Sequence, residues 1–329
     1  MASTQKVYTA PTATSVEIEG SALLSVVKHS SSNYPSLFSG TLLGFRSDEG
    51  TIDITHAYPY PYPDQYEGGL FKSKSGAKYQ QEIQETLKGL GYGVEFQGWF
   101  QSTFGGNFVT TQLVDSLAQQ QLSNANAFVL ILDMVSINKE LDVKALRLTE
   151  SFIKTYIDGK WKTKELATNE LTYQNIFEEI PVIIRNLKLV NLFLSSQGPS
   201  LDDSYDILNM SSNQNVNTQL LESLYSQVDA LNYDQSIFNY YQRQLQKEMG
   251  RVQQWKNQRR LDNLERAKNG EKELDPEEWK SLFRLPNEPS RYNSTLHSYA
   301  IDVLADDILK KCDHELTNAF AIERNLVQN

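Results

Sequence analysis

The sequence predicts an α/β (α+β) domain, with a mixed sheet flanked by helices, followed by a long α-helical C-terminal region. Up to about residue 190, apolar residues recur with both the two-residue period of strands and the 3.6-residue period of helices. Beyond residues 197–200 the strand signals stop, and Gln, Asn, Leu and charged residues dominate. From Leu221 onward the apolar residues fall into seven-residue columns, the spacing of long helices that pack side by side.

Composition restricts the class of protein. The chain has 329 residues, a net charge of −10 and a single cysteine, Cys312. The acidic balance argues against an autonomous nucleic-acid binder, and one cysteine excludes an internal disulfide and a multi-cysteine zinc finger. The N-terminal residues lack the apolar core of a signal peptide, and the longest apolar run, Phe128–Leu132, is too short to span a bilayer. We therefore expect a cytoplasmic protein without a membrane segment.

The first elements follow from alternation and turn residues. Ser15–Glu19 alternates and predicts a strand, and Gly20–His29 has helical spacing. Leu37–Phe45 and Thr51–Ala57 predict a β-hairpin around the turn Ser47–Gly50.

The next segment, Tyr58–Gly69, contains three prolines and is predicted to be a stiff surface loop near the polyproline conformation. An SH3-type ligand is the alternative, but a loop is the favoured interpretation. Lys78–Leu90 predicts an amphipathic helix. The remaining predicted elements of this part are the strand Val94–Phe100, the helix Val109–Gln120, the buried strand Ala127–Asp133, the strand Val143–Leu148 paired beside it, and the strand Pro181–Leu187.

These elements give a domain organisation. We expect a flexible N-terminus at 1–14, a mixed-sheet domain at 15–195 and a helical assembly region at 196–329. Within the assembly region the sequence predicts a heptad helix at about 215–266, a connector at 267–291 and a final helix at about 294–326.

The heptad helix carries two columns. One column is Leu221, Val228, Gln235, Gln242 and Met249, and the other is Leu224, Leu231, Phe238, Leu245 and Val252. The final helix has a similar stripe. Two such helices bury their stripes against each other or against a partner, and both alternatives stay open. Gln235 and Gln242 favour an interface that offers hydrogen-bond partners. The candidates for contact with partner helices are Leu221, Leu224, Val228, Leu231, Phe238, Leu245, Met249, Val252, Leu304, Ile308 and Leu316.

The segment Gly98–Asp115, GWFQSTFGGNFVTTQLVD, has the pattern of a zinc-hydrolase motif without its zinc ligands. With Leu37–Gly44 as a second anchor, it resembles the MPN domain, whose catalytic members are zinc isopeptidases of the JAMM type. Those enzymes have a glutamate three residues before the glycine that here is Gly40. A tryptophan then leads into His-Ser-His-Pro, and an aspartate follows eleven residues after the second histidine.

The resemblance assigns each ligand position to a residue of this chain. Leu37 occupies the glutamate position, Gln101 and Thr103 the two histidine positions, and Val114 the aspartate position. Asp115 lies one residue later, so either the spacing has shifted or this aspartate is not equivalent. Catalytic zinc requires three protein ligands and a water, and neutral amide or hydroxyl oxygens are poor ligands for it. We therefore expect no catalytic residue, no metal and no cofactor.

Further segments resemble the family of h subunits of eukaryotic translation initiation factor 3. They are the Gln-Ser-Thr form of the motif, AFVLILD, FEEIPVIIRN at Phe177–Asn186 and LFRLPNEPSR at Leu282–Arg291. The resemblance implies a non-catalytic structural and assembly subunit that supports mRNA recruitment to the 40S ribosomal subunit. It also implies pairing with the MPN-containing f subunit and a helical bundle with PCI-domain subunits. The alternatives are a non-catalytic MPN subunit of the proteasome lid or a related complex and, less favoured, a zinc-dependent deubiquitinase.

A basic strip interrupts the acidic chain. Between Arg243 and Arg260 there are six basic residues and one acid, Glu248. Candidates for contact are Arg251, Lys256, Arg259 and Arg260. Contact with RNA is one interpretation, whereas a solvated face or a face toward an acidic partner is the favoured one.

Overall fold

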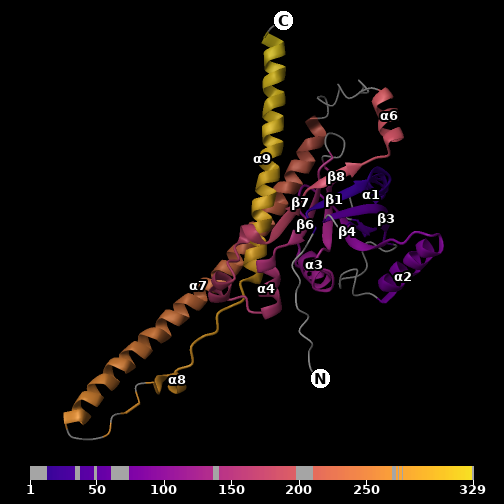
Figure 1. Cartoon of the computed structure of the whole chain (residues 1–329). Helices are drawn as coiled ribbons and strands as arrows, with labels where there is room; N and C mark the ends of the chain where they lie inside the picture. Colours follow the sequence, from indigo (N-terminus) through magenta and orange to yellow (C-terminus); the bar gives the residue numbers. More distant parts are fainter. Residues whose placement is uncertain are drawn as a thin grey trace.

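The structure, a computed structural model, describes residues 13–33, 38–47, 50–60, 74–135, 141–197, 210–268, 272, 274–275 and 277–327. Over these residues the predicted fold class is confirmed: a mixed sheet lies between helices, and two long helices follow it (Figure 1). Each helix of the described residues is too short or too polar to cross a membrane.

The sheet of the described residues has eight strands in the order β7-β6-β5-β4-β2-β3-β1-β8. Their bounds are β1 Ser15–Glu19, β2 Ser39–Arg46, β3 Thr51–Pro59, β4 Glu95–Thr103, β5 Phe128–Asp133, β6 Val143–Leu148, β7 Phe177–Ile180 and β8 Val182–Arg185. Strand β1 is parallel to β3 and to β8, β4 is parallel to β5, and the other neighbours are antiparallel. The strands β7 and β8 are therefore the two edges.

The helices of the described residues have the following bounds: α1 Gly20–Asn33, α2 Lys74–Gly89, α3 Thr111–Ser123, α4 Glu150–Asp158, α5 Thr163–Thr168, α6 Lys188–Gln197, α7 Met210–Lys268, α8 Trp279–Leu282 and α9 Tyr292–Val327. The predicted β2–β3 hairpin and the predicted pairing of β6 beside β5 are confirmed. Strand β7 and helices α4, α5 and α6 are additions that the sequence patterns did not predict.

Two predictions at the ends of elements need correction. The loop predicted to begin at Tyr58 begins later, because Tyr58 and Pro59 still pair with Thr41 and Gly40 of β2. The rest of that loop, and Leu37 at the start of the first hairpin strand, lie outside the described residues. At the N-terminus, Ala13 is buried, and its amide donates to Asn126 Oδ1 at 2.9 Å. The fixed part of the chain thus includes residues 13 and 14, which the sequence patterns assign to a flexible tail.

The sheet has a hydrophobic core on each face. Successive side chains of a strand point to opposite faces, so Trp99 packs on one side and Phe100 on the other. Helix α1 covers the Phe100 side through Ala22, Leu23 and Val26. The opposite cluster, called here the tail-side core, includes Trp99, Phe108, Val109, Leu113, Val114, Leu117, Val129, Ile131, Leu146, Leu148, Phe152, Phe177, Leu296 and Ala300. Strand β5 is buried on both faces, as its apolar sequence predicts.

The long helix α7 extends away from the sheet domain, and the chain returns along it (Figure 1). The returning segment, residues 274–291, is called here the strap. Asn263 of α7 forms two hydrogen bonds with the backbone of Leu274, and Arg291 at the other end lies 3.9 Å from the ring centre of Phe238. The predicted connector is therefore fixed along α7 over its described residues. We call the strap and residues 245–268 of α7 together the arm.

Candidate functional site

The two positions that the resemblance assigns to zinc-binding histidines, Gln101 and Thr103, lie at the end of β4. Thr103 is buried, and its hydroxyl has no hydrogen-bond partner among the described residues. Gln101 is partly exposed. Ser102, between them, accepts a 2.7 Å hydrogen bond from the Phe38 amide through its hydroxyl, and its own amide donates to the Phe38 carbonyl at 2.7 Å. The serine of the motif therefore fixes the end of β4 to the segment that leads into β2.

The loop after β4 is held by a buried carboxylate. Gly105 and Gly106 have φ angles of +58° and +73°, in the left-handed region that favours glycine. Asp133, at the end of β5, accepts hydrogen bonds from the amides of Gly105 at 2.9 Å and Val135 at 3.1 Å. Burial raises the pKa of Asp133, although these two hydrogen bonds and Lys311 oppose the rise. The loop is thus anchored to the sheet without a metal ligand.

The helical tail covers this loop. A Cβ atom added at Gly105 would lie 1.9 Å from Leu220 Cδ2 of α7, and one at Gly106 would lie 3.6 Å from Val303 Cγ1 of α9. A cavity of about 110 Å³ remains between the loop and α9, lined among others by Thr103, Asp133 and Asp307. The loop after β4 is therefore a contact surface within the chain.

The charges around this cavity are largely matched. Lys144 pairs with Asp142 at 3.5 Å, and Lys311 with Asp307 at 2.5 Å. Among the described residues, no group of three or more His, Cys, Asp or Glu side chains is arranged to hold a metal ion. The donors that remain at the expected positions are an amide and a hydroxyl, which are weak ligands for zinc.

Val114 and Asp115 have separate structural roles. Val114 is fully buried in the tail-side core, so a carboxylate at this position would lose its hydration. Asp115 accepts a 2.8 Å hydrogen bond from the Tyr292 hydroxyl at the start of α9. Burial, together with Asp115, raises the pKa of Tyr292. Asp115 therefore holds the tail helix, which gives this carboxylate a structural role.

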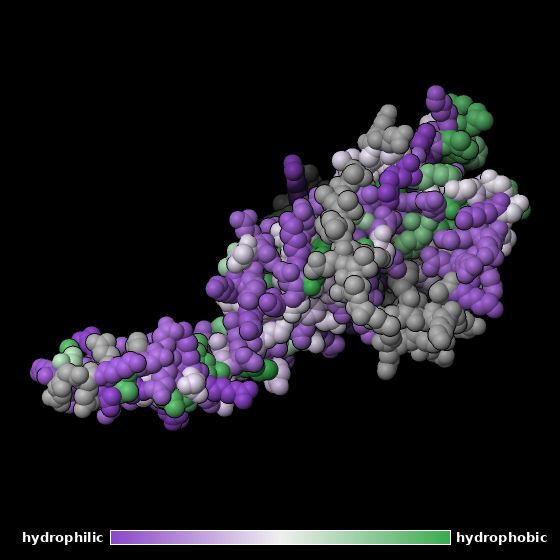
Figure 2. All heavy atoms as spheres, turned by 60° about the horizontal axis from the view of Figure 1, so that its bottom comes forward, coloured by the Kyte–Doolittle hydropathy of each residue, from purple (hydrophilic) through white to green (hydrophobic). Residues whose placement is uncertain are grey.

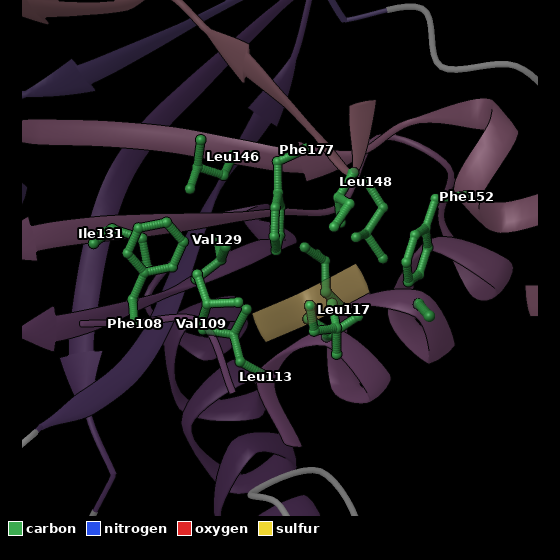
Figure 3. Close-up of a cluster of buried hydrophobic side chains, with 14 of the residues drawn as sticks. Phe108, Val109, Leu113, Leu117, Val129, Ile131, Leu146, Leu148, Phe152 and Phe177 are labelled. Atoms are coloured by element: carbon green, nitrogen blue, oxygen red, sulfur yellow. The ribbon is translucent and has the colours of Figure 1, made fainter. Parts of the chain in front are cut away.

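The N-terminal half of α9 completes the core of the sheet domain. Its residues Leu296 and Ala300 are buried in the tail-side core, whose strand and α3–α4 side chains point toward one another in Figure 3. The ring of Tyr292 lies 4.6 Å from that of Trp161, and the ring of Tyr299 lies 5.1 Å from that of Phe177. Since residues far apart in sequence share this core, the start of α9 is structurally part of the sheet domain.

The heptad columns divide between buried and exposed positions. Leu224, Leu231, Phe238 and Leu245 are partly buried, and Val252 is 2% exposed. This column lies on the face of α7 that meets α9 and the strap. In the other column Leu221 and Met249 are exposed and Val228 is half-buried. On α9, Leu304 is buried and Ile308 half-buried, whereas Leu316 is exposed. Many of the residues predicted to contact partner helices are thus buried or half-buried within the chain itself.

The basic strip is also partly engaged within the chain. Arg259 forms an ion pair with Glu278 of the strap and lies 4.7 Å from the ring centre of Trp255. Lys256 lies 4.4 Å from the ring centre of Trp279. Arg251 pairs with Glu248 at 2.7 Å. Arg260 is exposed and has no ion pair among the described residues.

Helix α6 presents an apolar surface that the sequence patterns did not identify. Leu189, Leu192 and Phe193 are 80%, 68% and 59% exposed, and Ile183 and Ile184 of the adjoining edge strand β8 are exposed too. Figure 2 shows hydrophobic atoms gathered at the upper right, at the end of the body where α6 lies. The signal for it was the run Leu187–Leu194, LKLVNLFL, which is apolar at nearly every position.

Comparison with known proteins finds two families along the chain, and their boundary falls within the sheet domain. Residues 137–326 match the family described as the C-terminal region of eIF3h, and residues 11–126 match the family described as JAB1/Mov34/MPN/PAD-1 ubiquitin protease. The chain is 33% identical to the H subunit of eukaryotic translation initiation factor 3 from Yarrowia lipolytica, covering 87% of this chain and 91% of that protein. The H subunit from Arabidopsis thaliana is 33% identical, with coverage of 87% and 85%. That from Xenopus tropicalis is 29% identical, with coverage of 94% and 92%.

Proposed function

The chain belongs to the family formed by the H subunits of eukaryotic translation initiation factor 3, and from this premise we propose that it is a non-catalytic structural and assembly component of the initiation factor 3 complex. In this role it supports mRNA recruitment to the 40S ribosomal subunit. The observation that carries the assembly role is the uncovered apolar surface of α6 and β8. Contiguous apolar patches on soluble proteins commonly mark interfaces with other proteins.

The absence of catalysis is supported by the chemistry of the former zinc positions. Gln101 and Thr103 offer neutral oxygens, Val114 lies in the core, and Asp115 is bonded to Tyr292. A zinc hydrolase needs three strong ligands and an open position for water. Here the loop after β4 packs against α7 and α9. Fold maintenance, rather than hydrolysis, is the role that these contacts support.

The α6–β8 surface is the proposed site for the MPN-containing f subunit. Strand β8 is an edge of the sheet, with Ile183 and Ile184 exposed, and α6 follows it directly. An edge strand with an adjoining apolar helix offers both unpaired backbone groups and apolar area. A similar domain on the partner would cover both.

The distal part of α9 is the proposed contact for PCI-domain subunits. Leu309, Leu316 and Phe320 are exposed along the helix beyond its contact with the sheet domain. Asn217 of α7 lies 3.3 Å from Glu315, so the two helices still meet at this level. Exposed apolar residues on neighbouring turns of a helix suit a groove between partner helices.

The assembly role is tested by reconstitution with the f subunit. The double substitution Leu189→Glu with Phe193→Glu is expected to weaken binding by at least about tenfold, because it places charge in the proposed apolar contact. The matched control, Leu261→Glu with Ile237→Glu, changes two exposed apolar residues of α7 and should bind normally. Circular dichroism would check that both variants are folded. Equal binding by the two double variants would refute the α6–β8 assignment.

The non-catalytic role has its own test. The purified complex should contain no stoichiometric zinc bound to this chain and should not cleave a ubiquitin chain through it. Metal analysis and a cleavage assay measure these two properties. Cleavage that is lost on the Thr103→Ala substitution would overturn the proposal.

A further inference from the structure

A notch opens near the far end of the arm, between the last turns of α7 and the strap. Its volume is about 590 Å³, within the range of sites that hold small molecules or single side-chain anchors. Leu264, Ala267 and Trp279 supply its apolar lining. Leu264 is 54% exposed although it is apolar. The notch therefore offers apolar contact area that the described part of the chain leaves exposed.

The three cations of the notch differ in how far the chain itself holds them. Arg259 is held by Glu278 and by the Trp255 ring, so it serves the fold of the arm. Lys256 lies over the ring of Trp279 and is exposed. Arg260 is exposed with no ion pair among the described residues. Two solvent-facing cations thus border an apolar pocket in a chain of net charge −10.

The position of the strap is set before any ligand arrives. Asn263 both donates to the Leu274 carbonyl at 2.9 Å and accepts from the Leu274 amide at 3.0 Å. The ion pair between Arg259 and Glu278 then places Trp279 against α7. A preformed site loses less conformational entropy on binding than a flexible one.

RNA fits this notch less well than a peptide. One face of Trp279 is already occupied by the Lys256 ammonium group, so a base cannot stack there. Figure 2 shows hydrophobic atoms scattered over the arm among hydrophilic ones, as a peptide with an apolar anchor requires.

We propose that this notch binds an acidic peptide segment of a partner protein, with one apolar side chain between Leu264 and Trp279 and carboxylates on Lys256 and Arg260. The apolar anchor supplies most of the affinity, as buried anchors do at other interfaces. The two rim cations select acidic sequences and speed association. The proposal is independent of the α6–β8 surface, which lies on the sheet domain at the other end of the molecule (Figure 1).

The test uses the full chain and a fluorescein-labelled peptide with a central leucine between aspartate and glutamate residues. Fluorescence anisotropy should show saturable binding that weakens as salt is added. The variant Lys256→Glu with Arg260→Glu should weaken it by at least about tenfold. The control variant Arg243→Glu with Lys247→Glu makes the same charge change on the same helix outside the notch, and should bind as the wild type does.

Two further measurements test the apolar anchor and the chemical class of the ligand separately. The substitution Leu264→Ala, or replacement of the leucine in the peptide by serine, should also weaken binding if the anchor enters the notch. A labelled oligouridylate should bind more weakly than the peptide. The proposal is overturned if the two charge-reversal variants weaken binding equally, if the anchor changes have no effect, or if the oligouridylate binds more tightly.

Discussion

The hydroxyl of Tyr292, the first residue of α9, donates a 2.8 Å hydrogen bond to the carboxylate of Asp115 on α3. This bond joins two residues that are 177 positions apart in the chain. It lies where the strap ends and where α9 begins to cover the tail-side core. Asp115, the residue after Val114, thus helps to fix the direction in which helix α9 leaves the strap.

Removing this hydroxyl tests how much the bond contributes. The substitution Tyr292→Phe keeps the ring contact with Trp161 and is expected to reduce the free energy of unfolding by about 1–2 kcal/mol, since the acceptor is charged but partly solvated. Urea unfolding measures the change, and hydrogen exchange should show faster opening at the start of α9. The exposed Tyr225 provides the control, because Tyr225→Phe removes a hydroxyl without a comparable contact. If both variants unfold alike, the bond to Asp115 is energetically neutral.

The packing of Leu220 over the loop after β4 is tested by two glycine substitutions. Gly105→Ala and Gly106→Ala both place a Cβ at positive φ, which costs roughly 1–2 kcal/mol in either case. Only Gly105→Ala also meets Leu220, at 1.9 Å. We therefore expect Gly105→Ala to be the more destabilising in thermal unfolding and to loosen α7 from the sheet domain.

A second substitution isolates the steric part of that effect. Leu220→Ala should recover part of the loss in the Gly105→Ala background, because it removes the atoms that the new Cβ would meet. It should recover nothing in the Gly106→Ala background. Equal melting temperatures for the two alanine variants would mean that the loop and α7 are not in firm contact.

The buried carboxylate of Asp133 gives a prediction with a defined pH dependence. Burial raises its pKa in the folded protein, so the stability that this group contributes is complete below the unfolded pKa of about 4 and is lost as pH rises through the folded pKa. Asp133→Asn cannot ionise and retains an oxygen that accepts from Gly105. Its stability relative to the wild type should therefore increase between acid and neutral pH, as measured by urea unfolding at several pH values.

The alanine variant of the same residue has the opposite expectation. Asp133→Ala leaves the buried amide of Gly105 and the partly buried amide of Val135 without their acceptor and should cost about 1–3 kcal/mol at neutral pH. If Asp133→Asn and Asp133→Ala have the same stability, the hydrogen bonds to the loop contribute little.

The sheet could be predicted from the sequence where local patterns carry the information. Strand β5 is apolar from Phe128 to Leu132 because both of its faces are covered, and the hairpin of β2 and β3 has polar turn residues between two strand-like runs. Helices α4 and α6 were missed. Helix α6 directly follows the strand β8, and its apolar run lacks the polar face by which an amphipathic helix is recognised.

The candidate site was harder to predict because its contacts are long-range. Periodicity identified the column of Leu224 and Leu231, but it paired that column with Leu221 and Val228. The inward neighbours also include Leu220 and Gln227, whereas Leu221 is exposed, and Gln227 contacts His297 at 2.7 Å. A polar residue whose hydrogen-bond partner lies 70 positions away cannot be assigned to a helix interface from the spacing of apolar residues. The same limit applies to Asp115, whose partner Tyr292 comes from the far side of the strap.

The two hydrogen bonds between Asn263 and Leu274, called here the clamp, give the last prediction. The side chain of Asn263 satisfies both the amide and the carbonyl of Leu274, so Asn263→Ala should release this end of the strap at a cost of about 1–2 kcal/mol. Asn263→Asp retains the acceptor for the Leu274 amide and loses only the donor, and should have an intermediate effect. Limited proteolysis within residues 274–285 measures the release, since exposed backbone is cleaved faster. Asn257→Ala, on the exposed surface of α7, is the control and should be cleaved as the wild type is. Cleavage of Asn263→Ala at the control rate would show that the ion pair of Arg259 with Glu278 holds the strap without the clamp.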